Sequence, residues 1–507
     1  MSTNEPDHTA PLADHIAAAG LPAAHSFVSG TFRQGGGPEF TTCHPGDGSE
    51  LATVQAATPE FADAAVAEAA AAQPAWAATP PHERARVLRA AAGLIEAQAV
   101  RLTTLIALDN GKTTAEARGD VMVAAAHLRA AAGWAATLEG ITLPADGTTL
   151  RMAFREPVGV VAAVIPFNTT FMFAAQKAGP ALAAGNAVLL KAPELSPLAA
   201  PVFARLLTDA GLPPGLLQVL QGAGDVGRRL VEHPAVTMVS FTGSTEAGRQ
   251  VMRSAAGGVK RVLLELGGKS ANIVYADADL DAALHATVGG VFRNAGQRCF
   301  SGSRLLVEDP VADAFTARVA DLARSIRVGP PFAPDSQLGA LISAAEAERV
   351  RSMVETAVGQ GARVLAGGER PAGLHLGGAY YAPTVLEIPP DLPKVPDIVY
   401  QEVFGPVLTV QRFGDAARAV ALANDSPFGL VGGCWTRDID RALTTARQVR
   451  SGYFWINSYG ALALDAPIGG VGLSGAGREL GRLGHEAYTE VKTVIIDTAA
   501  SAAPRWY

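Results

Sequence analysis

Between Thr58 and Gly111 the apolar residues recur with the period of an α-helix. Thr58 can cap a helix N-terminus and Pro59 suits the first helical position, so the pattern predicts a helix over residues 61–72 that ends before Pro74. Nothing in this segment suggests chemistry, and we interpret it as scaffold.

A second start signal follows at Thr79-Pro80. Apolar side chains then recur at helical spacing from Val87 to Ile95, with further helix to Leu108 and a stop at Asn110-Gly111. Residues 1 to about 25 show no sustained periodicity, and we predict a loose arm there.

From Val158 onward, short β-rich runs alternate with helical segments. Such alternation indicates βαβ units and parallel sheets. A chain of 507 residues is also too long for one core, since cores stop growing at about 250 to 300 residues. We therefore predict an α/β protein with two doubly wound parallel-sheet domains. The expected strands are residues 159–165, 187–190, 216–220, 237–241 and 262–264 in the first block, and 304–307, 407–411 and 432–436 in the second.

Residues 135–155 have a different pattern. Ile141-Thr142-Leu143, a turn signal over residues 144–147 and an extended run through Phe154 predict a hairpin. The edges of a hairpin need pairing, and the isolated strand-like segment 493–497 is the matching candidate. An ordinary surface hairpin is the alternative.

Composition narrows the function classes. The net charge of -7, with 49% hydrophobic and 18% charged residues, is typical of a globular protein without a face for nucleic acid. Apolar runs such as 158–167 reach about ten residues, half of a membrane span, and the N-terminus lacks a secretory pattern. The three cysteines, Cys43, Cys299 and Cys434, lack metal-ligand spacing and fit a reducing compartment, so we expect a cytoplasmic protein without a metal site.

One cysteine has the context of a nucleophile. Cys299 follows a helix-like apolar run, has Arg298 beside it, and lies between Gly296 and Gly302, which allow close backbone approach to a ligand. Since the thiolate is the reactive form of cysteine, a neighbouring cation favours reactivity. By itself this stretch is more typical of a small buried cysteine than of a nucleophile.

Four further stretches occur with it in a characteristic order. They are Ile165-Pro166-Phe167-Asn168, Lys191-Ala192-Pro193-Glu194, residues 241–248 with 264–269, and Gln401-Glu402-Val403-Phe404-Gly405-Pro406. Together with residues 292–302 they resemble the motif set of the aldehyde dehydrogenase superfamily, and the similarity runs from about Phe40 to about Thr493. Two positions depart from that pattern: Phe167 stands where Trp is usual, and Gly472 where Lys is common.

The resemblance implies a domain division and an assembly. Residues 1–134 and 156–267 would form a Rossmann-like NAD-binding domain, residues 268–472 the catalytic domain, and residues 135–155 with 473–507 a small β element that pairs between subunits. A homodimer or homotetramer is the implied state.

The resemblance also implies catalytic roles. Cys299 would be the nucleophile, Asn168 a hydrogen-bond donor to the oxyanion, and Glu265 the general base that activates water. Each residue has a structural alternative: a turn residue for Asn168, and a charge at a strand end for Glu265.

The cofactor is expected at glycine-rich turns and strand ends. Gly243 to Gly248 opens a helix whose amides would face the pyrophosphate, as in the family. The literal fingerprint Gly222-Ala223-Gly224-Asp225-Val226-Gly227 lacks the acidic residue that a full dinucleotide motif needs, but it can border the adenine. Either cluster alone could be a turn.

Lys191 and Glu194 resemble the pair that binds the adenosine ribose, and a carboxylate there favours NAD over NADP because it repels a 2′-phosphate. Glu402 and Phe404 resemble the residues that hold the nicotinamide ribose and ring. A helix cap is the alternative for Glu194. The expected cofactor set is Ile165, Pro166, Phe167, Asn168, Lys191, Glu194, Gly222, Gly227, Phe241, Thr242, Gly243, Ser244, Leu266, Gly267, Glu402 and Phe404.

These features predict an NAD-dependent enzyme that oxidises a small-molecule aldehyde to the free acid through a thiohemiacetal and a thioester on Cys299. The alternative enzyme is a CoA-acylating semialdehyde dehydrogenase, which Asn168 and the stretch before Cys299 also resemble. Glu265 argues against it, since CoA-acylating relatives typically lack that carboxylate. A non-enzymatic protein of this fold would be expected to lack a reactive group, and none is missing. The identity of the aldehyde stays open, and residues flanking a nucleophile often point away, so Arg298 does not decide it.

Overall fold

The computed structural model describes residues 12–20, 25–145 and 149–497. Its first sheet has the strand order β19-β11-β10-β7-β8-β9-β1-β2. The strands are β19 (Gly475–Ala476), β11 (Arg261–Glu265), β10 (Met238–Thr242), β7 (Val160–Val164), β8 (Ala187–Lys191), β9 (Leu217–Leu220), β1 (Ser26–Val28) and β2 (Thr31–Arg33). The five strands from β11 to β9 are parallel, and β19 and β1 join at the two sides as antiparallel neighbours.

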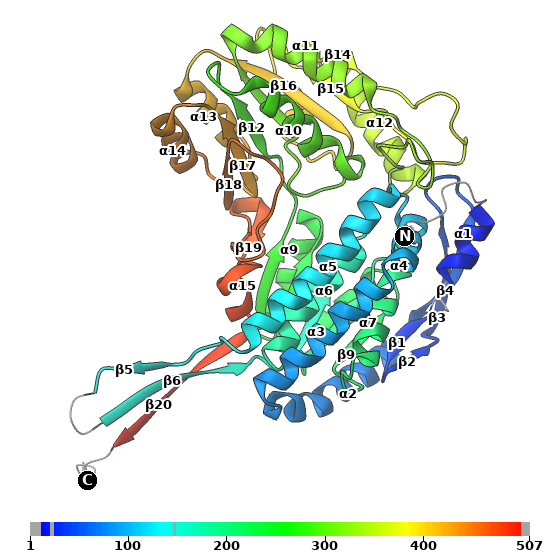
Figure 1. Cartoon of the computed structure of the whole chain (residues 1–507), viewed down its shortest axis with the longest axis vertical. Helices are drawn as coiled ribbons and strands as arrows, with labels where there is room; N and C mark the ends of the chain where they lie inside the picture. The colour runs from blue at the N-terminus through cyan, green and yellow to red at the C-terminus, as the bar shows by residue number, and fades with distance from the viewer. Residues whose placement is uncertain (1–11, 21–24, 146–148, 498–507) are drawn as a thin grey trace.

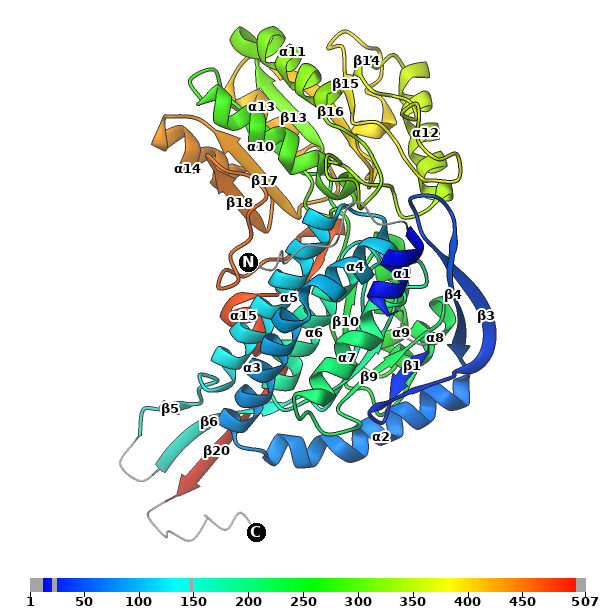
Figure 2. The same ribbon diagram turned by 45° about the vertical axis from the view of Figure 1, so that its right-hand side comes forward.

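Helices cover both faces of this sheet (Figures 1 and 2). They are α2 (Pro59–Ala78), α3 (Pro81–Ala97), α4 (Ala99–Asn110), α5 (Thr114–Ala135), α6 (Thr170–Ala183), α7 (Ala199–Asp209), α8 (Gly224–Glu232) and α9 (Thr245–Ala256). Among the described residues no single helix is long and apolar enough to cross a membrane. The pair α3 and α4 reaches the necessary length and hydropathy together, but it is bent by 77° and contributes to the buried core.

The second sheet has the order β14-β15-β16-β13-β12-β17-β18, and it is parallel except for β14. Its strands are β14 (Arg363–Ala366), β15 (Thr384–Glu387), β16 (Val407–Phe413), β13 (Arg304–Glu308), β12 (Ala271–Val274), β17 (Val431–Trp435) and β18 (Tyr453–Ile456). Its helices are α10 (Leu280–Phe292), α11 (Asp309–Ser325), α12 (Ala344–Gly359), α13 (Ala416–Asn424) and α14 (Ile439–Gln448). The two sheets have separate hydrophobic cores, and the predicted α/β class with two parallel-sheet units is confirmed.

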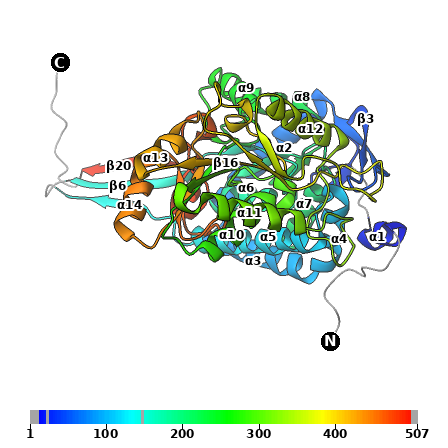
Figure 3. The ribbon, with the colours of Figure 1, turned by 90° about the horizontal axis from the view of Figure 1, so that it is seen from above.

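A three-stranded antiparallel arm projects from the first unit (Figures 1 and 3). β20 (Thr489–Asp497) pairs along its whole length with β6 (Thr149–Pro157), and β5 (Ile141–Leu143) pairs with the other edge of β6. The predicted hairpin and its C-terminal partner strand are therefore confirmed, although positions 146–148 of the expected turn lie outside the described residues. A shorter pair, β3 (Gly36–Cys43) and β4 (Glu50–Ala57), forms a ribbon beside the first unit (Figure 2).

The predicted stop at Pro74 is wrong, because α2 continues through it to Ala78. Tertiary contacts on both sides of Pro74 hold the last turns of α2. The indole of Trp76 donates to the Leu182 carbonyl at 2.9 Å, and the Gln73 amide donates to the Gly185 carbonyl at 3.0 Å. These contacts offset the backbone hydrogen bond that proline cannot donate.

Two other boundaries also differ from prediction. Thr79 is the C-cap of α2, and α3 begins after Pro80 without a side-chain cap. Part of the expected loose arm is the helix α1 (Leu12–Ala19), which is held because Arg101 donates to the Ala19 carbonyl at 2.9 Å. The rest of that arm, positions 1–11 and 21–24, lies outside the described residues.

Candidate active site

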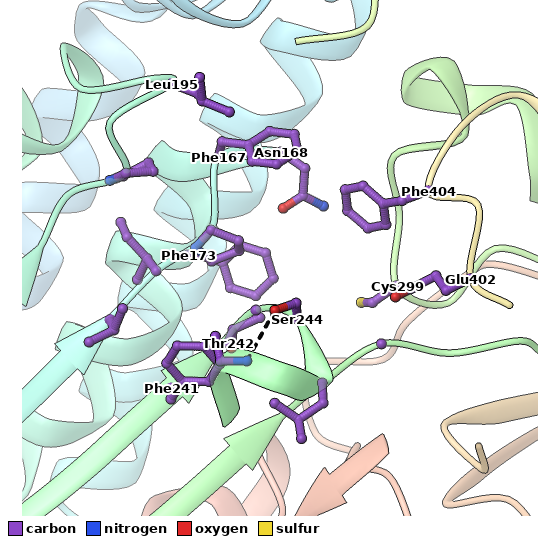
Figure 4. Close-up of a pocket in the computed structure, with 18 of the residues that line it drawn as sticks. Phe167, Asn168, Phe173, Leu195, Phe241, Thr242, Ser244, Cys299, Glu402 and Phe404 are labelled. Atoms are coloured by element: carbon purple, nitrogen blue, oxygen red, sulfur yellow. Dashed lines mark hydrogen bonds between the residues drawn. The ribbon is translucent and has the colours of Figure 1, made fainter. Parts of the chain in front are cut away.

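The carboxyl ends of β7, β10 and β11 border a cavity of about 520 Å³, the size of a cofactor or substrate site. Ligands of parallel sheets bind at such edges because the loops that follow the strands converge there. Figure 4 shows its lining residues, among them Phe167, Asn168, Cys299, Glu402 and Phe404. The cavity is lined by Val164, Ile165, Pro166, Phe167, Asn168, Phe173, Pro193, Glu194, Leu195, Phe241, Thr242, Gly243, Ser244, Ala247, Leu266, Gly267, Cys299, Glu346, Arg349, Glu402 and Phe404.

Cys299 enters the cavity from a strained turn. After α10 ends, Asn294 and Ala295 adopt left-handed backbone angles, with φ of 55° and 52°, although neither is glycine. Gly296 follows with φ of 71°, and a Cβ there would overlap the backbone of Gly405. Such conformations persist only where surrounding contacts fix them, so this turn is built to place Cys299.

The electrostatic surroundings of Cys299 keep its thiol protonated. Burial, together with the nearby carboxylates of Glu265 and Glu402, raises the pKa of Cys299 to about 12 against the opposing influence of Arg298. Burial also raises the pKa of Glu402 to about 7. A thiol in these surroundings needs a base or a change of surroundings before it can act as a nucleophile.

Glu265 is the last residue of β11, where it pairs with Gly475 of β19. Its side chain is buried beside Gly469, and it does not line the cavity itself. Burial and the neighbouring Glu479 raise the pKa of Glu265, against the opposing influence of Lys177 and Arg478. A carboxyl in this environment is a candidate proton acceptor near neutral pH.

Glu479 is held by the buried Lys177 of α6, whose ammonium lies 2.6 Å from its carboxylate. The amide of Gln176 donates to the other oxygen of the same carboxylate. Glu265 thus lies at one end of a charged cluster that extends away from the cavity.

Asn168 follows β7 and precedes α6. Its side-chain Nδ2 donates to the Gln297 carbonyl at 2.8 Å, which connects it to the turn that carries Cys299. One N–H of the amide is used in this bond, and the second remains for an oxygen bound at Cys299. Asn168 and Cys299 line the same cavity, although they are far apart in the sequence.

The expected cofactor residues fall into two groups, those that line the cavity and those that do not. Ser244 caps α9 by accepting from the Ala247 amide at 3.2 Å, which leaves the helix N-terminus facing the cavity. Lys191, Gly222 and Gly227 do not line the cavity, but the Lys191 ammonium lies 2.5 Å from the carboxylate of Glu194, which does.

Glu402 and Phe404 approach from the second unit. The Glu402 carboxylate accepts from the Gly268 amide at 3.0 Å and lies so close to Gly267 that any side chain there would overlap it. Phe404 has φ of 49°, and its ring meets Phe167 edge-to-face with centroids 5.8 Å apart. Phe167 thus provides an aromatic wall at the position where the family commonly has Trp.

The geometry can be compared with known proteins. A sequence model described as the aldehyde dehydrogenase family matches residues 32–494. The chain belongs to this family. A betaine aldehyde dehydrogenase of Cereibacter sphaeroides is 42% identical over 485 residues, which cover 95% of this chain and 99% of the relative.

Solved structures agree with this assignment. An NAD-dependent aldehyde dehydrogenase from Sinorhizobium meliloti has a TM-score of 0.93 at 39% identity, covering 99% of both chains. PnpE in complex with nicotinamide adenine dinucleotide also has a TM-score of 0.93 at 39% identity, covering 96% of this chain and 100% of that one. The protein is an aldehyde dehydrogenase that uses a nicotinamide dinucleotide cofactor.

Several lining residues of this aldehyde dehydrogenase were not predicted from the sequence. Glu346 and Arg349 reach the cavity from the first turns of α12, and Arg349 donates to the Val403 carbonyl at 2.6 Å. No local motif marks them, because their position depends on how the second unit closes over the first. The other unpredicted lining residues are Val164, Phe173, Pro193, Leu195 and Ala247.

Proposed function

We propose that Cys299, Asn168 and Glu265 together oxidise an aldehyde to the free carboxylic acid. The observation that carries this proposal is that Cys299 and Asn168 line the same cavity, while the Asn168 amide donates to the Gln297 carbonyl two residues before Cys299. The Cys299 thiol gives its proton to water in the cavity, and the resulting thiolate forms a bond to the carbonyl carbon. The oxygen becomes an oxyanion that accepts from Asn168 Nδ2 and from the backbone N–H of Cys299.

A nicotinamide cofactor held against Glu402 and Phe404 would supply a hydride acceptor, and loss of hydride from that carbon would leave a thioester on Cys299. Glu265 then removes a proton from water, the hydroxide adds to the thioester carbon, and the C–S bond breaks. The acid leaves and Cys299 is regenerated. Burial raises the pKa of Glu265, which makes its carboxylate a stronger proton acceptor for water than an exposed glutamate.

We further propose NAD as the preferred cofactor. The residues available to hold it are the N-terminus of α9 with Ser244 for the pyrophosphate, Glu194 for the adenosine ribose, and Glu402 with Phe404 for the nicotinamide half. Glu194 lines the cavity as a carboxylate, so it can accept from two ribose hydroxyls and would repel a 2′-phosphate.

The rival reaction transfers the acyl group to CoA instead of water. A base for water is unnecessary in that reaction, and the buried Glu265 therefore favours hydrolysis. NADH formation measured with an aldehyde, with and without CoA, separates the two reactions, and mass spectrometry identifies the product. We expect one free acid for each NADH without any need for CoA. NADH formation that depends on CoA and yields an acyl-CoA would contradict the hydrolytic proposal.

The domain division and the assembly follow from the same reasoning. We assign residues 1–134 and 156–267 to cofactor binding, 268–472 to the catalytic domain, and 135–155 with 473–507 to subunit bridging. The arm supports bridging because both of its outer strands expose large apolar side chains, with Ile141 58% and Ile495 64% exposed. We therefore propose a homodimer or homotetramer in the cytoplasm, and analytical ultracentrifugation distinguishes these states from a monomer.

A further inference from the structure

The segment that joins α4 to α5 contacts the backbone of both catalytic stretches. The side-chain amide of Asn110, the last residue of α4, donates to the Phe167 carbonyl at 2.6 Å. Lys112, with a side chain only 2% exposed, donates from Nζ to the Asn168 carbonyl at 2.7 Å. The same ammonium lies 2.6 Å from the carboxylate of Asp120 on α5.

The Asn168 carbonyl accepts a second hydrogen bond, from the side chain of Asn294 at 3.2 Å. Asn168 is thus fixed at both ends: its backbone oxygen by Lys112 and Asn294, and its side-chain Nδ2 by the Gln297 carbonyl. The stronger backbone contact is the one from Lys112, because a charged donor makes a shorter and stronger hydrogen bond than a neutral amide.

The first turn of α5 also holds the turn at Asn294, Ala295 and Gly296, called here the nucleophile turn, which precedes Cys299. Glu116 closes a capping box with Thr113, and its other carboxylate oxygen accepts from the Asn294 backbone N–H at 2.6 Å. Asn294 is the first of the two non-glycine residues in left-handed conformation before Cys299. Residues 110–120 therefore fix the Asn168 stretch and the Cys299 turn relative to each other.

We propose that Lys112 is a positioning residue for the oxyanion site: its ammonium, held by Asp120, fixes the Asn168 backbone so that the amide is directed at the oxygen on Cys299. This proposal rests on the function proposed above. The cost of desolvating the ammonium is offset by one carboxylate and one carbonyl, and both are local to the site. Loss of an oxyanion donor lowers kcat by about 10²- to 10³-fold, and a donor that is only misplaced is expected to lower it by about 10- to 100-fold.

The test is the double variant Lys112→Met/Asp120→Asn, which removes both buried charges together and keeps the length of the lysine stem. We expect the pre-steady-state rate of NADH formation to fall by about 10- to 100-fold, with the NAD dissociation constant unchanged. In an Asn168→Ala background the same double change should cost nothing further, because Lys112 acts through Asn168.

The matched control is Lys260→Met. Lys260 Nζ also donates to two carbonyls, those of Val231 and His233, at 2.7 and 2.5 Å, but away from the cavity, and we expect wild-type rates. If the first double variant does not fold, Lys112→Leu/Asp120→Leu removes the same bond from Asn168 and leaves no unpaired polar group at either position.

Hydrolysis of p-nitrophenyl acetate provides a readout that does not depend on aldehyde oxidation, since thiolate attack on this ester also places an oxyanion beside Asn168. We expect the same loss in this assay. A wild-type enzyme that cleaves the ester but oxidises no aldehyde would overturn the proposed function and leave Lys112 testable. A folded double variant with wild-type ester and NADH rates, or one with an equal loss in the Asn168→Ala background, would overturn the role of Lys112.

Discussion

The backbone of Gly268 lies against Cys299, so that a Cβ at position 268 would be 2.6 Å from the Cys299 carbonyl oxygen and 3.3 Å from Leu430 Cβ. Gly268→Ala should therefore displace the nucleophile turn and lower kcat/KM for an aldehyde by about 10- to 100-fold, because small displacements of a nucleophile are costly. The control is Gly93→Ala in α3, where an added Cβ meets nothing within 4 Å. It should keep full activity and gain about 0.5 to 1 kcal/mol in free energy of unfolding. Full activity in Gly268→Ala would show that the turn tolerates the shift.

The role of Glu265 is tested by Glu265→Gln, which keeps the shape of the side chain but removes the base. Attack and one hydride transfer should survive, while hydrolysis of the thioester slows by about 10²- to 10⁴-fold. NADH should appear as a rapid phase of about one equivalent per active site and then nearly stop. Intact-mass measurement should find the acyl group on the protein, and Glu265→Gln/Cys299→Ala should carry none. Steady turnover at the wild-type rate would contradict the assignment.

The protonation of Cys299 should respond to its two carboxylate neighbours. Both Glu265 and Glu402 raise the pKa of Cys299, so replacing either by Gln should lower that pKa and increase the thiolate fraction at a given pH. Alkylation by iodoacetamide, followed against pH, reports the thiolate directly. In the wild type the alkylation rate should still rise above pH 9, and in each variant the rise should shift to lower pH. An unchanged or raised midpoint would show that these charges do not act on the thiol.

Cofactor preference should depend on Glu194. Glu194→Ser removes the negative charge that would face a 2′-phosphate, so the ratio of kcat/KM for NAD to that for NADP should fall by about tenfold, equivalent to roughly 1.4 kcal/mol. Glu96→Ser is the matched control, because Glu96 is also a partly exposed carboxylate paired with a cation, Arg129, and it lies outside the cavity. An unchanged ratio in Glu194→Ser would exclude Glu194 as the ribose ligand.

The sequence predicted the five parallel strands of the first sheet because they are continuous apolar runs bounded by turn residues, as in β8 and β10, but it missed the antiparallel β1, β2 and β19. It missed β12, where the polar Asn272 interrupts the apolar run. Asn272 is nevertheless buried, because its side chain donates to Thr287 at 2.8 Å and accepts from the Trp435 indole at 3.0 Å. Only the packed structure provides those partners.

In the candidate site, too, residues in local motifs were predicted and residues placed by tertiary contacts were not. Motifs located Cys299 and Glu402, because each lies in a local run of recognisable residues. Lys112 was not predicted, since its bond to Asn168 spans 56 residues of sequence and its own surroundings look like an ordinary helix boundary. The left-handed backbone angles of Asn294 and Ala295 were also not predicted from the sequence, because tertiary contacts rather than residue type impose them.

The pairing of β19 with β11 has a consequence for how the chain matures on the ribosome. Glu265 sits at the exposed side of β11 until Gly475 arrives, and Ser474 then supports the following backbone by donating to the Gly267 carbonyl at 2.7 Å. The strand that ends at Glu265 therefore lacks this neighbour until about 210 further residues have been synthesised. A chain that has not yet reached Gly475 therefore contains Cys299 but lacks the strand that pairs beside Glu265.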